Sequence, residues 1–369
     1  MDLSKFSVAA AVPSEFRDRY VFEGDKLESL YTKSKRHQWD AEVDVDWKEF
    51  DPTMDIRDRS TDFMFRLNCV QELSEADQTA LWRGMNIFLI SQILHGEQAA
   101  LMTCGQLVNC VPDLEGKFAA SVQVMDEARH VEVFARYLDC QKERFPIDPD
   151  LKWIVESLLA ESEWEAKCVG MQIILESVAL SFFRLGEKSA VEPVFKQFIG
   201  RVHEDEARHV AYGVLALEDR IPVLPAKTRM RLENWAYDAV ARLAGRAGKP
   251  AFRSQFDALA TTGIDLESFL PKLMAETSDA SHIDIDGLDD PMAQTVLPNL
   301  MRVGLVPVRL VPGYLAQGFR VDLATRRVDD IHSWHADTRA VRAEFARESV
   351  DFSSAQEVSR FTTSSQTPS

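Results

Sequence analysis

The chain of 369 residues is poor in cysteine and in basic side chains. Its five cysteines include no Cys-x-x-Cys pair, and their odd number does not indicate a disulfide framework, so a reducing cytoplasm is the expected location. Lysine and arginine number 42 against 59 aspartates and glutamates, which gives a net charge of −17. This balance disfavours binding to nucleic acid and to an anionic membrane surface.

Long hydrophobic runs are also missing. No stretch of about 18 uncharged apolar residues occurs, and the N-terminus lacks the charged segment and apolar core of a signal peptide. We therefore expect neither a secreted nor a membrane-spanning protein. The chain also has no Gly-rich dinucleotide fingerprint with which to take electrons from a nicotinamide cofactor.

One hexapeptide, DEARHV, occurs twice in the chain, with the copies 79 residues apart. Each copy contains Glu-x-x-His, a pattern that on its own arises easily by chance. On a helix, positions i and i+3 lie about 60° apart, so Glu127 and His130 share one face, as do Glu206 and His209. Two identical copies predict two carboxylate–imidazole pairs that bind a ligand such as a metal ion.

Two further acidic residues repeat with the same offset. Glu97 and Glu176 each lie in an apolar helical stretch, and each precedes a motif glutamate by 30 residues. A buried ion-pair network is the plainer explanation, but four carboxylates would then have only two imidazoles as partners. Arg129 and Arg208 point about 200° away from the motif glutamates and are expected to pair with acids elsewhere. The charge balance favours metal ions.

One Glu from each of two helices plus Glu-x-x-His from each of two others is the pattern of ferritin-like di-iron and di-manganese carboxylate bundles. On these residues, the chain resembles the O2-activating branch of that superfamily over roughly residues 74 to 220. That branch includes ribonucleotide reductase small subunits and di-iron N-oxygenases. The resemblance implies an all-α fold, a four-helix bundle with pseudo-twofold pairs and additional N- and C-terminal helices. It also implies a six-residue metal site: Glu97, Glu127, His130, Glu176, Glu206 and His209.

Neighbouring residues extend the predicted site. Asp126 and Asp205 match the aspartates of that branch, and the resemblance implies that each accepts the free ring N–H of a ligand histidine. His203 lies one turn before Glu206 and is a possible seventh ligand, although the para-aminobenzoate N-oxygenases have their extra histidine one position earlier. A surface histidine is the alternative. His332 and His335 also show helical ligand spacing, but a surface pair is the expected interpretation.

The resemblance implies two iron ions, or one manganese and one iron, because carboxylate-rich sites suit these metals. A radical-forming tyrosine of ribonucleotide reductase is replaced by Phe134, which leaves open only a Phe-containing Mn/Fe subclass. We predict a non-haem di-iron oxygenase or oxidase that performs N-oxygenation or hydroxylation of a small molecule. Manganese catalase or an iron-handling bundle is the alternative. The expected partners are O2, the substrate, a separate reductase or ferredoxin, and a second copy in a homodimer.

Helix signals place the bundle within the chain. Ser74 and several prolines predict four long helices, at about 74–111, 113–145, 150–186 and 190–220. A short helix is expected at 57–73, and three more are expected at 232–245, 266–276 and 291–304. The predicted division is a lead-in at 1–73, the bundle at 74–222, packed helices at 223–354 and a flexible tail at 355–369.

Overall fold

The structure is a computed structural model that describes residues 6–16, 18, 20, 26–244, 259–278 and 290–330. His332, His335 and the tail expected at 355–369 lie outside the described residues. Within them, nearly all regular structure is helical, which confirms the predicted all-α class.

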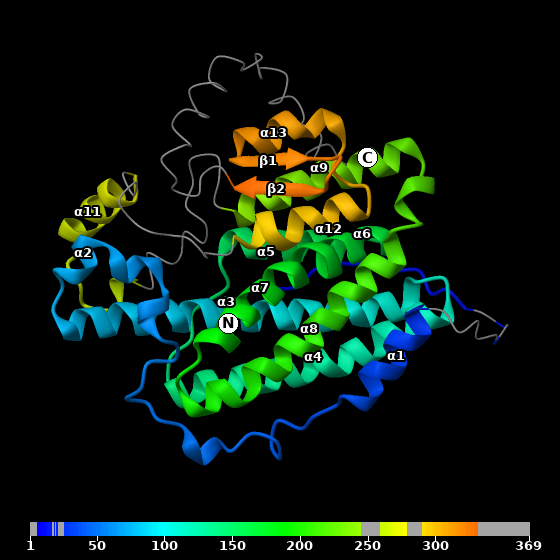
Figure 1. Cartoon of the computed structure of the whole chain (residues 1–369). Helices are drawn as coiled ribbons and strands as arrows, with labels where there is room; N and C mark the ends of the chain where they lie inside the picture. The colour runs from blue at the N-terminus through cyan, green and yellow to red at the C-terminus, as the bar shows by residue number, and fades with distance from the viewer. Residues whose placement is uncertain are drawn as a thin grey trace, which may run out of the picture.

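Four long helical segments form the bundle (Figure 1). Helix α3 packs along α4, and α7 packs along α8, so the two predicted pairs are present. The elements are α3 (Glu75–Cys110), α4 (Leu114–Gln141), α8 (Pro193–Leu217) and a composite helix made of α6 (Trp164–Cys168), the π-helical segment η4 (Val169–Leu175) and α7 (Glu176–Ser189).

Side-chain caps begin these helices where the sequence predicts. Ser74 accepts a hydrogen bond from the Asp77 backbone N–H, and Asp113 accepts one from Gly116. Helix α4 ends at Gln141, four residues before the predicted end, because Lys142 adopts a left-handed conformation with φ of 59°. The chain then turns toward α3 rather than extending α4.

The helix predicted at 150–186 is two helices. Helix α5 (Pro149–Ala160) ends before a break at residues 161–163, and the composite helix starts at Trp164. The buried Lys167 ammonium donates to the Leu158 carbonyl at 2.8 Å, which satisfies an acceptor at the end of α5. Such a tertiary contact outweighs the helical pattern of the sequence. The π-helical segment directly precedes Glu176 and is entirely buried.

The N-terminal part runs over the bundle as short elements. Helix α1 (Lys26–Arg36) packs against α4 and α8 (Figure 1). The single helix predicted at 57–73 is wrong, because aspartate caps divide this stretch into short turns: Asp58 caps at Ser60 and Asp62 at Met64. These elements are η1 (Trp47–Glu49), η2 (Arg59–Thr61), η3 (Phe63–Arg66) and α2 (Asn68–Gln71).

The C-terminal part covers one side of the bundle. The three predicted helices are present, although the one at 291–304 begins as a π-helical segment, and an antiparallel hairpin of two strands was not predicted (Figure 1). The main hydrophobic core is continuous from the bundle into this layer. The elements are η5 (Ile221–Val223), α9 (Ala226–Leu243), α11 (Leu266–Ser278), η7 (Met292–Val296), α12 (Leu297–Arg302), η8 (Val308–Leu310), α13 (Val311–Ala316), β1 (Phe319–Asp322) and β2 (Arg327–Asp330).

Among the described residues, the stretch Trp164–Ser189 alone has the length and apolarity of a membrane span. Of its most apolar window, 67% is buried inside the protein. A core helix has the same composition, so this stretch is weak evidence for a membrane.

The close approach of α8 to the π-helical segment gives a testable prediction. A Cβ added at Gly213 would clash with the Gln172 Cβ and lie 3.3 Å from the Gln172 backbone carbonyl carbon. We expect Gly213→Ala to lower the free energy of unfolding by about 1–3 kcal/mol, as overpacking does. Urea denaturation measures this change.

Gly105 is the matched control, because it lies in α3 and an added Cβ meets nothing within 4 Å. Gly105→Ala should raise the free energy of unfolding by about 0.5–1 kcal/mol through helix propensity. Equal effects of the two substitutions would contradict the predicted packing constraint.

Candidate metal centre

The six residues predicted as ligands converge from the four bundle helices. Each is at most 4% exposed. Their ligand atoms form two groups, each with all atoms within 4.8 Å of one another. Glu127 and Glu206 belong to both groups. The first group adds Glu97 and His130, and the second adds Glu176 and His209.

Both histidines direct Nδ1 toward the carboxylates. His130 Nδ1 lies 3.0 Å from Glu206 Oε1 and 3.2 Å from Glu97 Oε2. His209 Nδ1 lies 3.1 Å from Glu127 Oε1 and 3.2 Å from Glu206 Oε2. One imidazole nitrogen and several carboxylate oxygens therefore surround each of two points in the bundle core.

The opposite ring nitrogens contact the motif aspartates in a crossed arrangement. His130 Nε2 lies 3.1 Å from Asp205, and His209 Nε2 lies 3.3 Å from Asp126. Each hexapeptide thus supplies the aspartate for the histidine of the other. An Nε2–H that donates to the aspartate leaves the Nδ1 lone pair directed at the carboxylates, which is the tautomer a metal ligand needs.

Arginines hold these aspartates in place. Arg129 Nη2 donates to Asp126 at 2.7 Å and to Asp205 at 2.9 Å, and all three side chains are buried. Arg208 also pairs with Asp205. The expectation that the two arginines pair with acids elsewhere is wrong, since both bind aspartates that border the site. Their charges still do not reach the four glutamates.

The segment after α1 contributes two residues that the sequence analysis missed. Trp39 Nε1 donates to Asp205 at 2.8 Å, and Gln38 Nε2 donates to Asp126 at 2.7 Å. The Arg129 guanidinium lies over the Trp39 ring, 4.7 Å from its centroid. These contacts span up to 166 residues of sequence, so no local pattern could reveal them.

A buried glutamine, Gln123, was also missed. Its amide nitrogen donates to Glu127 at 2.9 Å and to Glu176 at 2.8 Å, while its oxygen accepts from Gln172. Gln123 precedes Glu127 by one helical turn, and that spacing in α4 was the signal that could have identified it.

Burial and mutual repulsion set the protonation of the cluster. Burial, with the charge of Glu206 next, raises the pKa of Glu97 and Glu176 well above the usual carboxyl value. Burial opposes charge on Glu127 too, but the two imidazoles hold its pKa well below that value. Burial disfavours charged histidine, yet the surrounding carboxylates raise the pKa of His130 and His209. A metal ion would displace the protons that this cluster holds.

The donor set fits two metal ions. Glu127 Oε2 and Glu206 Oε1 are buried and accept no hydrogen bond from any described residue. Unsatisfied buried carboxylate oxygens are costly unless a cation is nearby. They belong to the two glutamates that both groups share, which is where an ion would compensate them.

His203 is not part of the cluster, and its prediction as a seventh ligand is a correction. Its Nδ1 lies 2.8 Å from Glu187 Oε2, and the side chain is 24% exposed. His203 lies six residues before His209, so the two are about 120° apart around α8. His203 therefore faces α7 near the surface while His209 faces the cluster.

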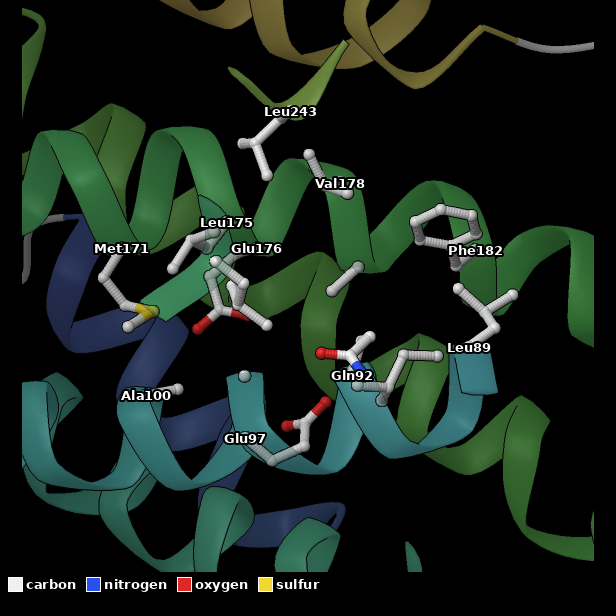
Figure 2. Close-up of a pocket in the computed structure, with 14 residues that line it drawn as sticks. Leu89, Gln92, Glu97, Ala100, Met171, Leu175, Glu176, Val178, Phe182 and Leu243 are labelled. Atoms are coloured by element: carbon white, nitrogen blue, oxygen red, sulfur yellow. The ribbon is translucent and has the colours of Figure 1, made fainter. Parts of the chain in front are cut away.

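An apolar pocket of about 60 Å³ adjoins the cluster. Glu97 and Glu176 lie on its wall, whereas Leu89 and Phe182 lie toward its other end (Figure 2). The remaining lining is mainly aliphatic, so a bound molecule would meet carboxylates only beside the cluster.

No family model and no curated protein matches the chain. Similar solved structures include two mutants of an R2-like ligand-binding oxidase with a reconstituted Mn/Fe cofactor. The first has 15% sequence identity and a TM-score of 0.43, and covers 70% of this chain and 94% of that one. The second has 16% identity and a TM-score of 0.44, and covers 68% and 90%. A likeness this distant carries no argument, so the site is argued from the chain's own residues.

The shared arginine gives a stability prediction. In Arg129→Met, Asp126 and Asp205 lose their common buried cation, and we expect the free energy of unfolding of the metal-free protein to fall by about 3–5 kcal/mol. Arg208→Met is the control, since Arg208 is 14% exposed and its loss leaves Asp205 paired with Arg129. Urea denaturation compares the two, and a loss in Arg129→Met no larger than in the control would refute the assigned role.

Proposed function

We propose that the chain is a di-metal carboxylate enzyme that activates O2 to oxidise a small organic substrate, by N-oxygenation or hydroxylation. The observation that carries the proposal is the pair of four-residue groups that share Glu127 and Glu206. Two glutamates common to two groups suit two ions held side by side.

Iron at both positions, or manganese with iron, is the proposed occupancy. Each group offers three carboxylates and one imidazole, a hard donor set that zinc sites rarely use. When bound, such ions supply the reduction of O2 and the oxidising power that no side chain has. A Mn/Fe cofactor is also what the similar R2-like oxidases carry.

The protein's own residues position and isolate this chemistry. Asp126 and Asp205 fix the histidine tautomers, and Arg129 fixes the aspartates. Gln123 fixes Glu127 and Glu176 relative to each other. The apolar pocket excludes water and holds the substrate beside Glu97 and Glu176.

The pocket favours an organic substrate over the alternatives of manganese catalase or iron handling, which need no apolar chamber. At the position of the radical tyrosine, Phe134 is fully buried and packs on Phe183 and Phe198. A Phe-containing reductase subunit has no need of a chamber either. A separate electron donor and a homodimer remain predictions.

Metal content tests the ligand set. We expect about two ions per chain in the reconstituted protein, because the cluster forms two ligand groups. Glu127→Gln or Glu206→Gln should lose both ions, since each glutamate belongs to both groups, whereas Glu97→Gln or Glu176→Gln should lose mainly one. Elemental analysis of protein whose helicity is checked by circular dichroism gives the stoichiometry.

His203→Gln is the control, because His203 pairs with Glu187 outside the cluster. It should keep both ions. Full metal occupancy in Glu127→Gln and Glu206→Gln would remove the basis of the proposed function.

Turnover tests the chemistry. Transfer of one oxygen atom from O2 to a substrate, with the other leaving as water, consumes two electrons from outside the substrate. The chemically reduced protein, exposed to O2 with a panel of small apolar amines, should yield at most one oxidised product per metal pair. NADH alone should not sustain turnover, whereas an added ferredoxin and its reductase should.

Mass spectrometry with labelled O2 identifies the product. Oxidation of the metal pair with no product from the amines or from hydrocarbon substrates would contradict an oxygenase. Rapid disproportionation of hydrogen peroxide instead would favour the manganese catalase alternative.

A further inference from the structure

A second, larger cavity lies against the pocket beside the metal centre. Its volume is about 330 Å³, and it shares Leu89, Val178, Phe182 and Leu243 with the inner pocket. Figure 2 places these residues away from Glu97, toward the side where the outer cavity continues. The shared apolar residues thus connect the cluster to an outer chamber.

The outer cavity contains a buried arginine. Arg57 lines it and is only 8% exposed. Its Nε donates to Asn86 Oδ1 at 2.7 Å, and its guanidinium lies over the Trp82 ring, 4.9 Å from the ring centroid. Trp82 is itself fixed, because its Nε1 donates to the Arg57 carbonyl at 2.7 Å. The guanidinium is held rigidly by one edge and one face.

The other edge of this guanidinium has no protein partner in the described part of the chain. Neither Nη atom of Arg57 has an acceptor among these residues, and Arg57 forms no ion pair with any of their carboxylates. Burial lowers its pKa, with only the more distant charge of Asp62 acting in the other direction. A buried cation without a carboxylate partner costs stability. A rigid fork of free N–H groups is the geometry that binds a carboxylate at two points.

Two acids also line the outer cavity, and both bind helix starts. Asp62 Oδ1 accepts from the Met64 N–H at 3.0 Å, and Asp290 Oδ1 accepts from the Met292 N–H at 2.7 Å. Their charges limit how much negative charge a ligand can bring. They favour a singly charged carboxylate over a dianionic phosphate.

We propose that the outer cavity is a carboxylate-binding subsite in which Arg57 holds the acid group of a substrate whose apolar body extends past Leu89 and Phe182 to Glu97 and Glu176. The word substrate rests on the proposed function, whereas the binding site does not. The substrate class is then a small monocarboxylic acid with an apolar chain or ring, oxidised at a position remote from its acid group.

Binding to the full-length, metal-free protein tests this. Octanoate and the neutral 1-octanol share an apolar body, and calorimetric titration should give octanoate at least tenfold tighter binding. Arg57→Gln should abolish the difference by weakening octanoate alone, and Arg57→Lys should restore part of it. Arg59→Gln is the matched control, since Arg59 pairs with Asp55 and Glu75 and does not line the cavity. It should change nothing.

Thermal unfolding keeps the test clear of folding effects. Because Arg57 has no ion-pair partner among the described residues, Arg57→Gln should melt no lower than the original protein, apart from the loss of the Asn86 bond. Octyl phosphate distinguishes the acid groups and should bind more weakly than octanoate. Octanoate that binds Arg57→Gln as tightly as the original protein, or 1-octanol that binds equally well, would overturn the proposal.

The connection between the chambers has its own test. An added Cβ at Gly96 meets nothing within 4 Å and Gly96 lines the inner pocket, whereas Gly105 on the same helix does not line it. Gly96→Ala should weaken octanoate but not butanoate, which is short enough to stay in the outer chamber. Gly105→Ala should affect neither acid. Equal affinities of octanoate for the two variants would show that the chain does not reach the inner pocket.

These measurements fail independently of the proposed function. Arg57-dependent binding in a protein that takes up no metal would leave the carboxylate site in place and remove the enzyme. Full metal loading with binding that ignores Arg57 would do the opposite.

Discussion

The structure depends on how four glutamates are buried in the apolar core of a helical bundle. Glu97, Glu127, Glu176 and Glu206 have only two imidazoles beside them, and two of their oxygens accept no hydrogen bond from the described residues. Without a cation, the cluster must hold protons or remain strained. Much of the surrounding sequence answers this constraint: the Asp–Arg–Asp bridge, the glutamine between two glutamates and the tryptophan above them.

The crossed hydrogen bonds make the two halves of the bundle mutually dependent. Asp126 orients the histidine of α8, and Asp205 orients the histidine of α4. Arg129 bridges both aspartates. Although each half repeats the same hexapeptide, neither half contains a complete set of ligands with their hydrogen-bond partners. The internal repeat is therefore a repeat of sequence more than of independent function.

Much of the site could be predicted from the sequence because its ligands lie on helices at regular spacing. The repeated offset of Glu97, Glu127 and His130 identified the six-residue set that the structure brings together. His203 failed because one turn from Glu206 is not one turn from His209, and the angular error accumulates along α8. Gln38 and Trp39 could not be found, because their partners are distant in sequence. The break at 161–163 follows from a tertiary contact of Lys167 that no helical periodicity records.

The placement of Trp39 and Gln38 has a consequence for how the protein can be divided. Every predicted metal ligand lies between Glu97 and His209, so the bundle alone has the complete coordinating set. The groups that orient that set begin before the bundle, in a segment that lies across α4 and α8 after helix α1. A fragment trimmed to the four helices would keep the ligands and expose the aspartates behind them to water. The minimal folding unit and the minimal chemical unit of this protein are thus different lengths of chain.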